Sequence, residues 1–159
     1  MGRRRCGSIC QGIEGGLGLS VHFWDTNLFI YLIEQDPTWH DTIIKIRQDM
    51  LAKDDILVTS TLTLGEVLVK PLRENRLDLA EKYRSILTSS SVILINFDES
   101  VAERFAKKRS QYGKKVKPPD AIQLACAGAY RVDLFITNDE RLEEIMVDGV
   151  SEIVSLGKL

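Results

Sequence analysis

Short apolar runs alternate with longer segments of helical spacing from residue 21 onward. The short runs are rich in β-branched and aromatic residues, which predicts strands over residues 21–24, 56–60, 92–97, 133–137 and 152–156. The longer segments repeat apolar residues three and four positions apart, which predicts helices over residues 27–33, 38–52, 62–73, 77–89, 100–112 and 119–130, with a short helical turn after Asp139. This alternation is typical of an α/β fold in which helices wrap a parallel sheet.

The first 20 residues break this pattern. They contain six of the 11 glycines, and no apolar run long enough for a signal peptide follows Arg3, Arg4 and Arg5. The stretch "GGLGLS" follows no strand and lacks the third glycine of a dinucleotide fingerprint. We interpret residues 1–20 as a disordered glycine-rich extension or a start-site artefact, and residues 21–159 as one domain.

Charge and cysteine content exclude several classes. The chain has 21 basic and 23 acidic residues, and without residues 1–20 (three Arg, one Glu) it has 18 and 22, unlike a uniformly basic nucleic-acid binder. Its three cysteines form no CxxC pair, which favours a reduced, cytoplasmic protein without a zinc site. No stretch is long and apolar enough to cross a membrane.

Four acids occupy equivalent places in this pattern. Asp25 directly follows the first predicted strand and Asp139 follows the fourth, while Glu66 and Asp120 lie in the first turns of two helices. Ligands of open parallel sheets bind at the carboxyl ends of the strands, so Asp25 and Asp139 are expected to face each other across one crevice if their strands are neighbours, with Glu66 and Asp120 at the same rim. Carboxylates brought together repel one another unless a cation compensates, and Mg²⁺ or Mn²⁺ prefers such oxygen ligands.

Each acid also has a purely structural explanation. Asp25, Asp120 and Asp139 could cap or complement helix starts, and Glu66 could pair with Lys70 four residues later. Caps alone do not explain why polar companions recur beside the strand-end acids. These companions, which could orient carboxylates or metal-bound waters, are Thr26, Asn27, Thr137 and Asn138.

The stretches "DTNLFIYL", "TSTLTLGEV", "PDAIQLA" and "FITNDERL" resemble, in order and spacing, the motifs of PIN-domain ribonucleases, particularly VapC-type toxins of toxin-antitoxin pairs. The resemblance covers residues 21 to about 156. It implies a three-layer α/β/α fold with a central, mostly parallel sheet, and cleavage of single-stranded or loop RNA with Mg²⁺ or Mn²⁺. It also implies a homodimer and a cognate antitoxin. Leu142 stands where relatives often have phenylalanine.

The resemblance carries over Asp25, Glu66, Asp120 and Asp139 as the metal-binding quartet, and Thr26, Asn27 and Thr137 as polar supports. The implied chemistry is metal-assisted phosphodiester hydrolysis, in which the three aspartates hold one metal ion and Glu66 helps to bind a second or orients a water. The only histidines, His22 and His40, lie in a predicted strand and on a predicted surface helix, so a paired-histidine nuclease fits poorly. Ser60 and Cys126 have no histidine partner for nucleophilic catalysis.

One segment is a candidate RNA-binding strip. Residues 104–117 contain seven Lys or Arg and no acid, and we expect Lys114, Lys115 and Lys117 to contact phosphates while Tyr112 stacks on a base. The equally simple alternative is a solvated helix face and loop.

Other functions remain open at this point. A dehalogenase-type phosphatase would need an acid where Asn27 stands, and a receiver domain would need adjacent acids after the first strand. The remaining alternatives are a PIN-like nuclease acting in RNA processing or on DNA outside a toxin pair, and a catalytically silent module that binds a partner protein.

Overall fold

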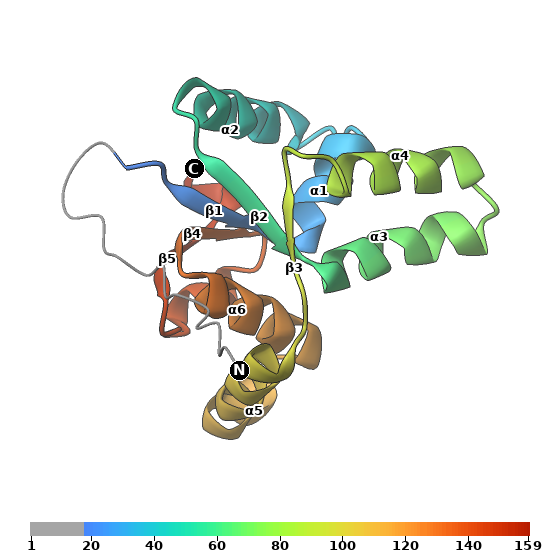
Figure 1. Cartoon of the computed structure of the whole chain (residues 1–159). Coiled ribbons are helices and arrows are strands. Elements are labelled where there is room, and N and C mark those ends of the chain that lie inside the picture. The colour runs from blue at the N-terminus through green and yellow to red at the C-terminus, as the bar shows by residue number, and fades with distance from the viewer. Residues whose placement is uncertain (1–17) are drawn as a thin grey trace, which may run out of the picture.

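A five-stranded parallel sheet forms the centre of the molecule (Figure 1). The structure, a computed structural model, describes residues 18–159. Its strands are β1 (Val21–Trp24), β2 (Ile56–Ser60), β3 (Ile93–Ile95), β4 (Val132–Thr137) and β5 (Val150–Ser155). They lie in the order β3-β2-β1-β4-β5, and all four neighbouring pairs are parallel, so the predicted α/β class is confirmed.

Successive side chains of each strand enter two separate cores. Phe23 packs on one face of the sheet, where its ring stacks on Phe135 at 4.9 Å, while Trp24 packs on the other face with Ile136. This period of two leaves both faces of the central strands apolar, which is why these strands read as continuous hydrophobic runs.

Helices cover both faces and complete three layers (Figure 1). The first face is covered by α1 (Thr26–Ile33), α2 (His40–Ala52), α3 (Thr61–Arg73) and α4 (Leu77–Leu87), whose apolar residues share the core that contains Trp24. The second face is covered by α5 (Glu99–Tyr112) and α6 (Pro118–Tyr130). Residues 18–159 also form three short 3₁₀ helices: η1 (Gly113–Lys115), η2 (Glu140–Glu144) and η3 (Leu156–Lys158).

The sequence-based boundaries differ from these by a few residues. The most shortened element is β3, predicted over residues 92–97 and observed over three residues, while β5 starts two residues before its predicted start and ends one residue before its predicted end. Strand β3 ends early because Asp98 caps α5 by accepting a hydrogen bond from the Val101 amide at 3.0 Å, and Phe97 turns toward Phe105 instead of continuing the strand. Most of the expected extension, residues 1–17, lies outside the described residues. Between residues 18 and 159 no helix is both long and apolar enough to span a bilayer.

Candidate active site

The carboxyl edge of the sheet carries the four acids of the sequence analysis. Asp25 follows β1 directly, and Asp139 comes two residues after β4. These two strands are parallel neighbours, and the Asp25 amide donates to the Ile136 carbonyl at 3.0 Å. Glu66 enters from α3 and Asp120 from the first turn of α6. Four segments far apart in the sequence therefore contribute one acid each.

Asp25 is both a helix cap and a buried member of this group. One carboxylate oxygen accepts from the Thr26 amide and the other from the Thr137 hydroxyl, both at 2.8 Å. The pKa of Asp25 is raised to about 6, chiefly by burial and to a smaller degree by the charges of Asp120 and Glu66, while these two hydrogen bonds act in the opposite direction. The cap explanation holds for Asp25 but does not account for the nearby acids.

Asp120 is half-buried and surrounded by charge. Burial is the largest cause that raises its pKa, and the negative charges of Asp139 and Glu66 act in the same direction. Lys117 and Arg141 oppose them. The charges of neighbouring acids thus affect the pKa of Asp120, and the side chains of Lys117 and Arg141 are close enough to partly compensate them.

Glu66 is oriented by a hydroxyl and not by a neighbouring lysine. The Thr26 hydroxyl donates to its Oε2 at 2.5 Å. Lys70, the alternative partner expected from the helical spacing, pairs instead with Glu34 at 3.4 Å. The explanation of Glu66 as a helical ion pair is therefore wrong.

Asp139 is engaged by a residue of its own segment. Arg141 places Nε 2.8 Å from one carboxylate oxygen and Nη2 2.5 Å from the other. This bidentate contact is the first cause of the lowered pKa of Asp139. The Asp139 amide also donates to the Thr137 hydroxyl, so Thr137 links both strand-end aspartates.

Gln123 of α6 organises a buried polar network beneath the acids. Its Oε1 accepts from the Ser60 hydroxyl at 2.6 Å, and its Nε2 donates to the Thr26 and Thr63 hydroxyls at 3.0 and 2.9 Å. Thr59 extends the network by donating to the Trp24 carbonyl or to Thr63. Gln123 was not among the residues expected from the sequence. The signal was a polar residue three positions after Asp120, on a helix otherwise rich in alanine and leucine.

The predicted polar companions divide into two groups. Thr26 and Thr137 contact carboxylates, as expected. Asn138 instead donates to the Tyr31 hydroxyl at 2.8 Å, and Asn27 is exposed. The two threonines therefore have a visible orienting role, while the two asparagines do not contact the four acids.

The basic strip is not a uniform surface. Arg109 donates to the carbonyls of Gly113 and Val116, which ties the loop after α5 to the helix. The Tyr112 hydroxyl accepts from the Met146 amide at 3.1 Å, and its ring packs against the second core. Lys114, Lys115 and Lys117 are exposed, and the charge of Lys117 reaches Asp120 and Asp139.

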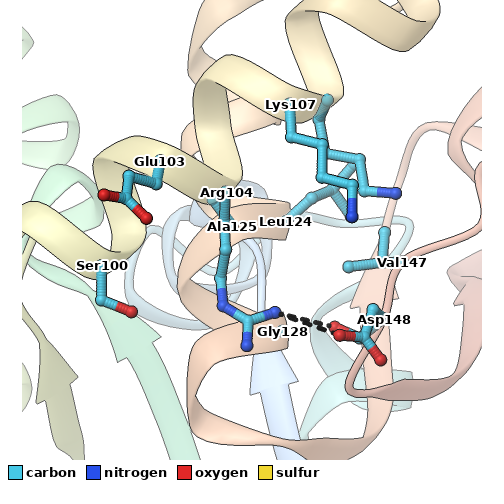
Figure 2. Close-up of a pocket in the computed structure, with 10 residues that line it drawn as sticks. Ser100, Glu103, Arg104, Lys107, Leu124, Ala125, Gly128, Val147 and Asp148 are labelled. Atoms are coloured by element: carbon cyan, nitrogen blue, oxygen red, sulfur yellow. Dashed lines mark hydrogen bonds and ion pairs between the residues drawn. The ribbon is translucent and has the colours of Figure 1, made fainter.

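The earlier part of the strip borders a separate cavity of about 410 Å³ between α5, α6 and the loop before β5 (Figure 2). Arg104 crosses it to Asp148, with 3.6 Å between the charged atoms. Lys107 also lines it, while Lys108 donates to the Met146 carbonyl. None of the four acids lines this cavity, so these three cations belong to another part of the surface.

The four acids offer the kind of ligand that a hard divalent cation such as Mg²⁺ prefers. All four side chains offer oxygen. The pKa values of Asp25 and Asp120 are raised mainly by burial and in smaller part by the neighbouring acids, and a bound cation would stabilise both carboxylates in their charged form. In the described part of the chain, however, no three His, Cys, Asp or Glu side chains are already arranged to hold a metal ion. Arg141 occupies both oxygens of Asp139, and Thr26 occupies one of Glu66. A metal ion that binds Asp139 would therefore require Arg141 to change its partner, whereas Glu66 could keep its contact with Thr26.

Comparisons with known structures support the fold. The structure of VapBC2 from Rickettsia felis bound to a promoter DNA fragment matches with a TM-score of 0.68 and 17% identity, over 85% of this chain and 98% of that one. A toxin-antitoxin complex from Klebsiella pneumoniae matches with a TM-score of 0.58 and 28% identity, and the match covers 81% of this chain and 94% of that one. VapC20 from Mycobacterium tuberculosis, described as a sarcin-ricin loop cleaving toxin, matches with a TM-score of 0.60 and 18% identity. The match covers 72% of this chain and 86% of that one.

Curated protein sequences give no significant match. The family model of the PIN domain matches residues 23–147, which include all four acids, the second half of β1, and the whole of β2, β3 and β4. The match confirms the family resemblance that the four sequence motifs indicated. The chain belongs to the PIN domain family.

Proposed function

We propose that this protein is a metal-dependent endoribonuclease that hydrolyses phosphodiester bonds in single-stranded or loop RNA, and that it is the toxin of a toxin-antitoxin pair. The observation that carries the proposal is the convergence of four acids whose burial and mutual charge raise the pKa values of Asp25 and Asp120. A chain gains no stability from such crowding, so a cation is the natural reason for it.

The hydrogen-bond partners of each acid suggest its role in binding a metal ion. Asp25 is held by the Thr137 hydroxyl and the Thr26 amide, so its carboxylate is fixed before a metal ion or RNA arrives. Asp120 and Asp139 would complete the oxygen ligands, and Thr26 would keep Glu66 turned toward the same space. When bound, Mg²⁺ or Mn²⁺ would supply positive charge for the phosphate and a nucleophile at neutral pH.

The toxin assignment is supported by the structural relatives. The Klebsiella pneumoniae chain, at 28% identity, comes from a toxin-antitoxin complex. We infer that this protein has a cognate antitoxin, forms a homodimer and acts in the cytoplasm. A PIN-like nuclease of RNA processing, or one that acts on DNA, would use the same acids, and a catalytically silent protein-binding module would need none of them.

Cleavage of defined substrates tests the proposal. The purified protein should cut single-stranded RNA with Mn²⁺ or Mg²⁺ and stop when EDTA removes the metal, because the acids alone supply no positive charge to the phosphate. Single-stranded DNA of the same sequence is the matched substrate. Cutting of DNA alone would favour the DNA-acting alternative, and cutting that persists in EDTA would contradict the metal-dependent mechanism.

The exposed lysines give a second prediction. Replacing Lys114, Lys115 and Lys117 with alanine should weaken RNA binding and reduce the slope of log affinity against log salt by roughly 0.7 for each phosphate that a lysine no longer neutralises. The measurement is fluorescence polarisation of a labelled RNA over a series of salt concentrations. A matched triple substitution of Lys45, Lys53 and Lys82 removes the same charge from α2, the turn after it and α4. An equal change of slope in both variants would argue for a general charge effect and against the strip.

A further inference from the structure

The side chain of Arg141 binds Asp139 at the edge of the four-acid site and so brings a positive charge of the protein to that site. Three of its nitrogens donate to Asp139: the amide at 3.0 Å and Nε at 2.8 Å to Oδ1, and Nη2 at 2.5 Å to Oδ2. The negative charge of Asp120 also acts on the guanidinium. One arginine therefore occupies a carboxylate that the proposed function assigns to a metal ion.

The local chain explains how this contact forms. Asp139 is the N-cap of the 3₁₀ helix η2, and Arg141 is the second residue of that helix. The capping hydrogen bond brings the backbone of Arg141 to the carboxylate, so its side chain has only to fold back over its own turn. The pair forms within a single turn, so it needs no contact with the rest of the fold.

The contact is also easy to exchange. The Arg141 side chain is 67% exposed and that of Asp139 is 25% exposed, so water and salt screen the pair. An exposed ion pair of this kind competes weakly with a divalent ion. The planar guanidinium matches a phosphate in the same bidentate geometry that it uses with a carboxylate.

We propose that Arg141 is an exchangeable internal counter-cation, which pairs with Asp139 in the metal-free protein and moves to an RNA phosphate when a divalent ion takes the carboxylate. The inference rests on the proposed nuclease function. It gives Arg141 two effects of opposite sign: it competes with the metal ion, and it contributes to the binding of RNA once the metal ion is bound. An arginine that only neutralised Asp139 would compete with the metal ion but would make no contribution to RNA binding.

The test measures both effects in Arg141→Gln. Titration calorimetry with Mn²⁺ alone should give roughly two- to fivefold tighter binding than in the wild type, the fold-change of an exposed ion pair. At saturating Mn²⁺ the KM for single-stranded RNA should rise several-fold. Arg141→Lys keeps the charge without the bidentate fork, so its Mn²⁺ affinity should stay near the wild-type value while its KM still rises.

Arg84→Gln is the matched control, because it removes one arginine from an exposed ion pair with Glu81 on α4, where the charged atoms are 3.5 Å apart. It should leave both the Mn²⁺ affinity and the KM unchanged. If wild-type protein binds Mn²⁺ but Arg141→Gln binds it no more tightly, or if its KM is unchanged, the exchange is wrong and the nuclease function stands. If the wild type binds no Mn²⁺, the metal-dependent function fails and the exchange fails with it.

Discussion

Asp120→Asn should reduce Mn²⁺-dependent RNA cleavage by roughly two to three orders of magnitude while raising the melting temperature of the metal-free protein by a few degrees. Both effects have one cause. Asp120 is half-buried, and Asp139 and Glu66 add negative charge to its surroundings, so its carboxylate is unfavourable without a cation and useful with one. Cleavage of labelled RNA measures the loss of activity, and thermal unfolding in EDTA measures the rise in melting temperature.

Asp78→Asn provides the matched control for this variant. Asp78 also lies in the first turn of a helix, α4, but it does not belong to the four-acid group. Its substitution should leave cleavage unchanged and should not raise the melting temperature, because it removes an acid that complements the helix dipole. Undiminished cleavage by Asp120→Asn would contradict the proposed site, and a lower melting temperature in EDTA would contradict the electrostatic strain.

Asp25→Asn should reveal a pH-dependent strain in the metal-free protein. The pKa of Asp25 rises from 3.8 to about 6 on folding, chiefly through burial. Between these two values the unfolded chain releases the proton and the folded chain keeps it, so the free energy of unfolding of the wild type decreases as pH rises and levels off above the folded pKa. The difference between the variant and the wild type should therefore grow by about 3 kcal/mol between roughly pH 4 and pH 7, in favour of the variant.

Chemical denaturation in EDTA at several pH values measures this difference. The substitution also weakens a hydrogen bond from Thr137 or the Thr26 amide. The part of that loss that depends on the charge of Asp25 is already contained in its folded pKa, and the remainder shifts the whole curve. Asp98→Asn reports the removal of a capping charge alone, because the side chain of Asp98 also caps a helix, α5, by accepting from the Val101 amide. A difference between Asp25→Asn and wild type that stays constant from pH 4 to pH 7 would mean that the carboxylate of Asp25 is not strained.

The strands and helices could be predicted because their signals are local. Apolar runs that end at Asp25 and after Ser60 mark strand ends, and Pro118 and Pro119 open α6 at the expected place. The parallel direction of the strands then follows from the alternation of strands and helices, and it brings the carboxyl ends of all strands to one edge. The order of the strands was not predicted, and the structure supplies the pairing of β1 with β4 that makes the strands before Asp25 and Asp139 neighbours.

The partners of the acids could not be predicted in the same way. Whether Glu66 bonds to Lys70 or to Thr26 depends on side-chain rotamers that the spacing of the residues does not determine. Arg141 lies two residues from Asp139, a spacing that normally separates side chains in a regular helix, and only the short 3₁₀ turn brings them together. Structural and functional explanations also proved compatible at Asp25, which caps α1 while facing the other acids.

The side-chain amide of Gln123 determines which hydroxyls of the buried network donate and which accept hydrogen bonds. Ser60 donates its proton to Oε1, and Nε2 uses its two hydrogens on Thr26 and Thr63. Since Thr26 already accepts from this amide, its own single proton is free to point outward to Glu66. A neutral side chain on α6 thereby helps to orient an acid on α3, so the alignment of that carboxylate depends on how α6 is seated against the network.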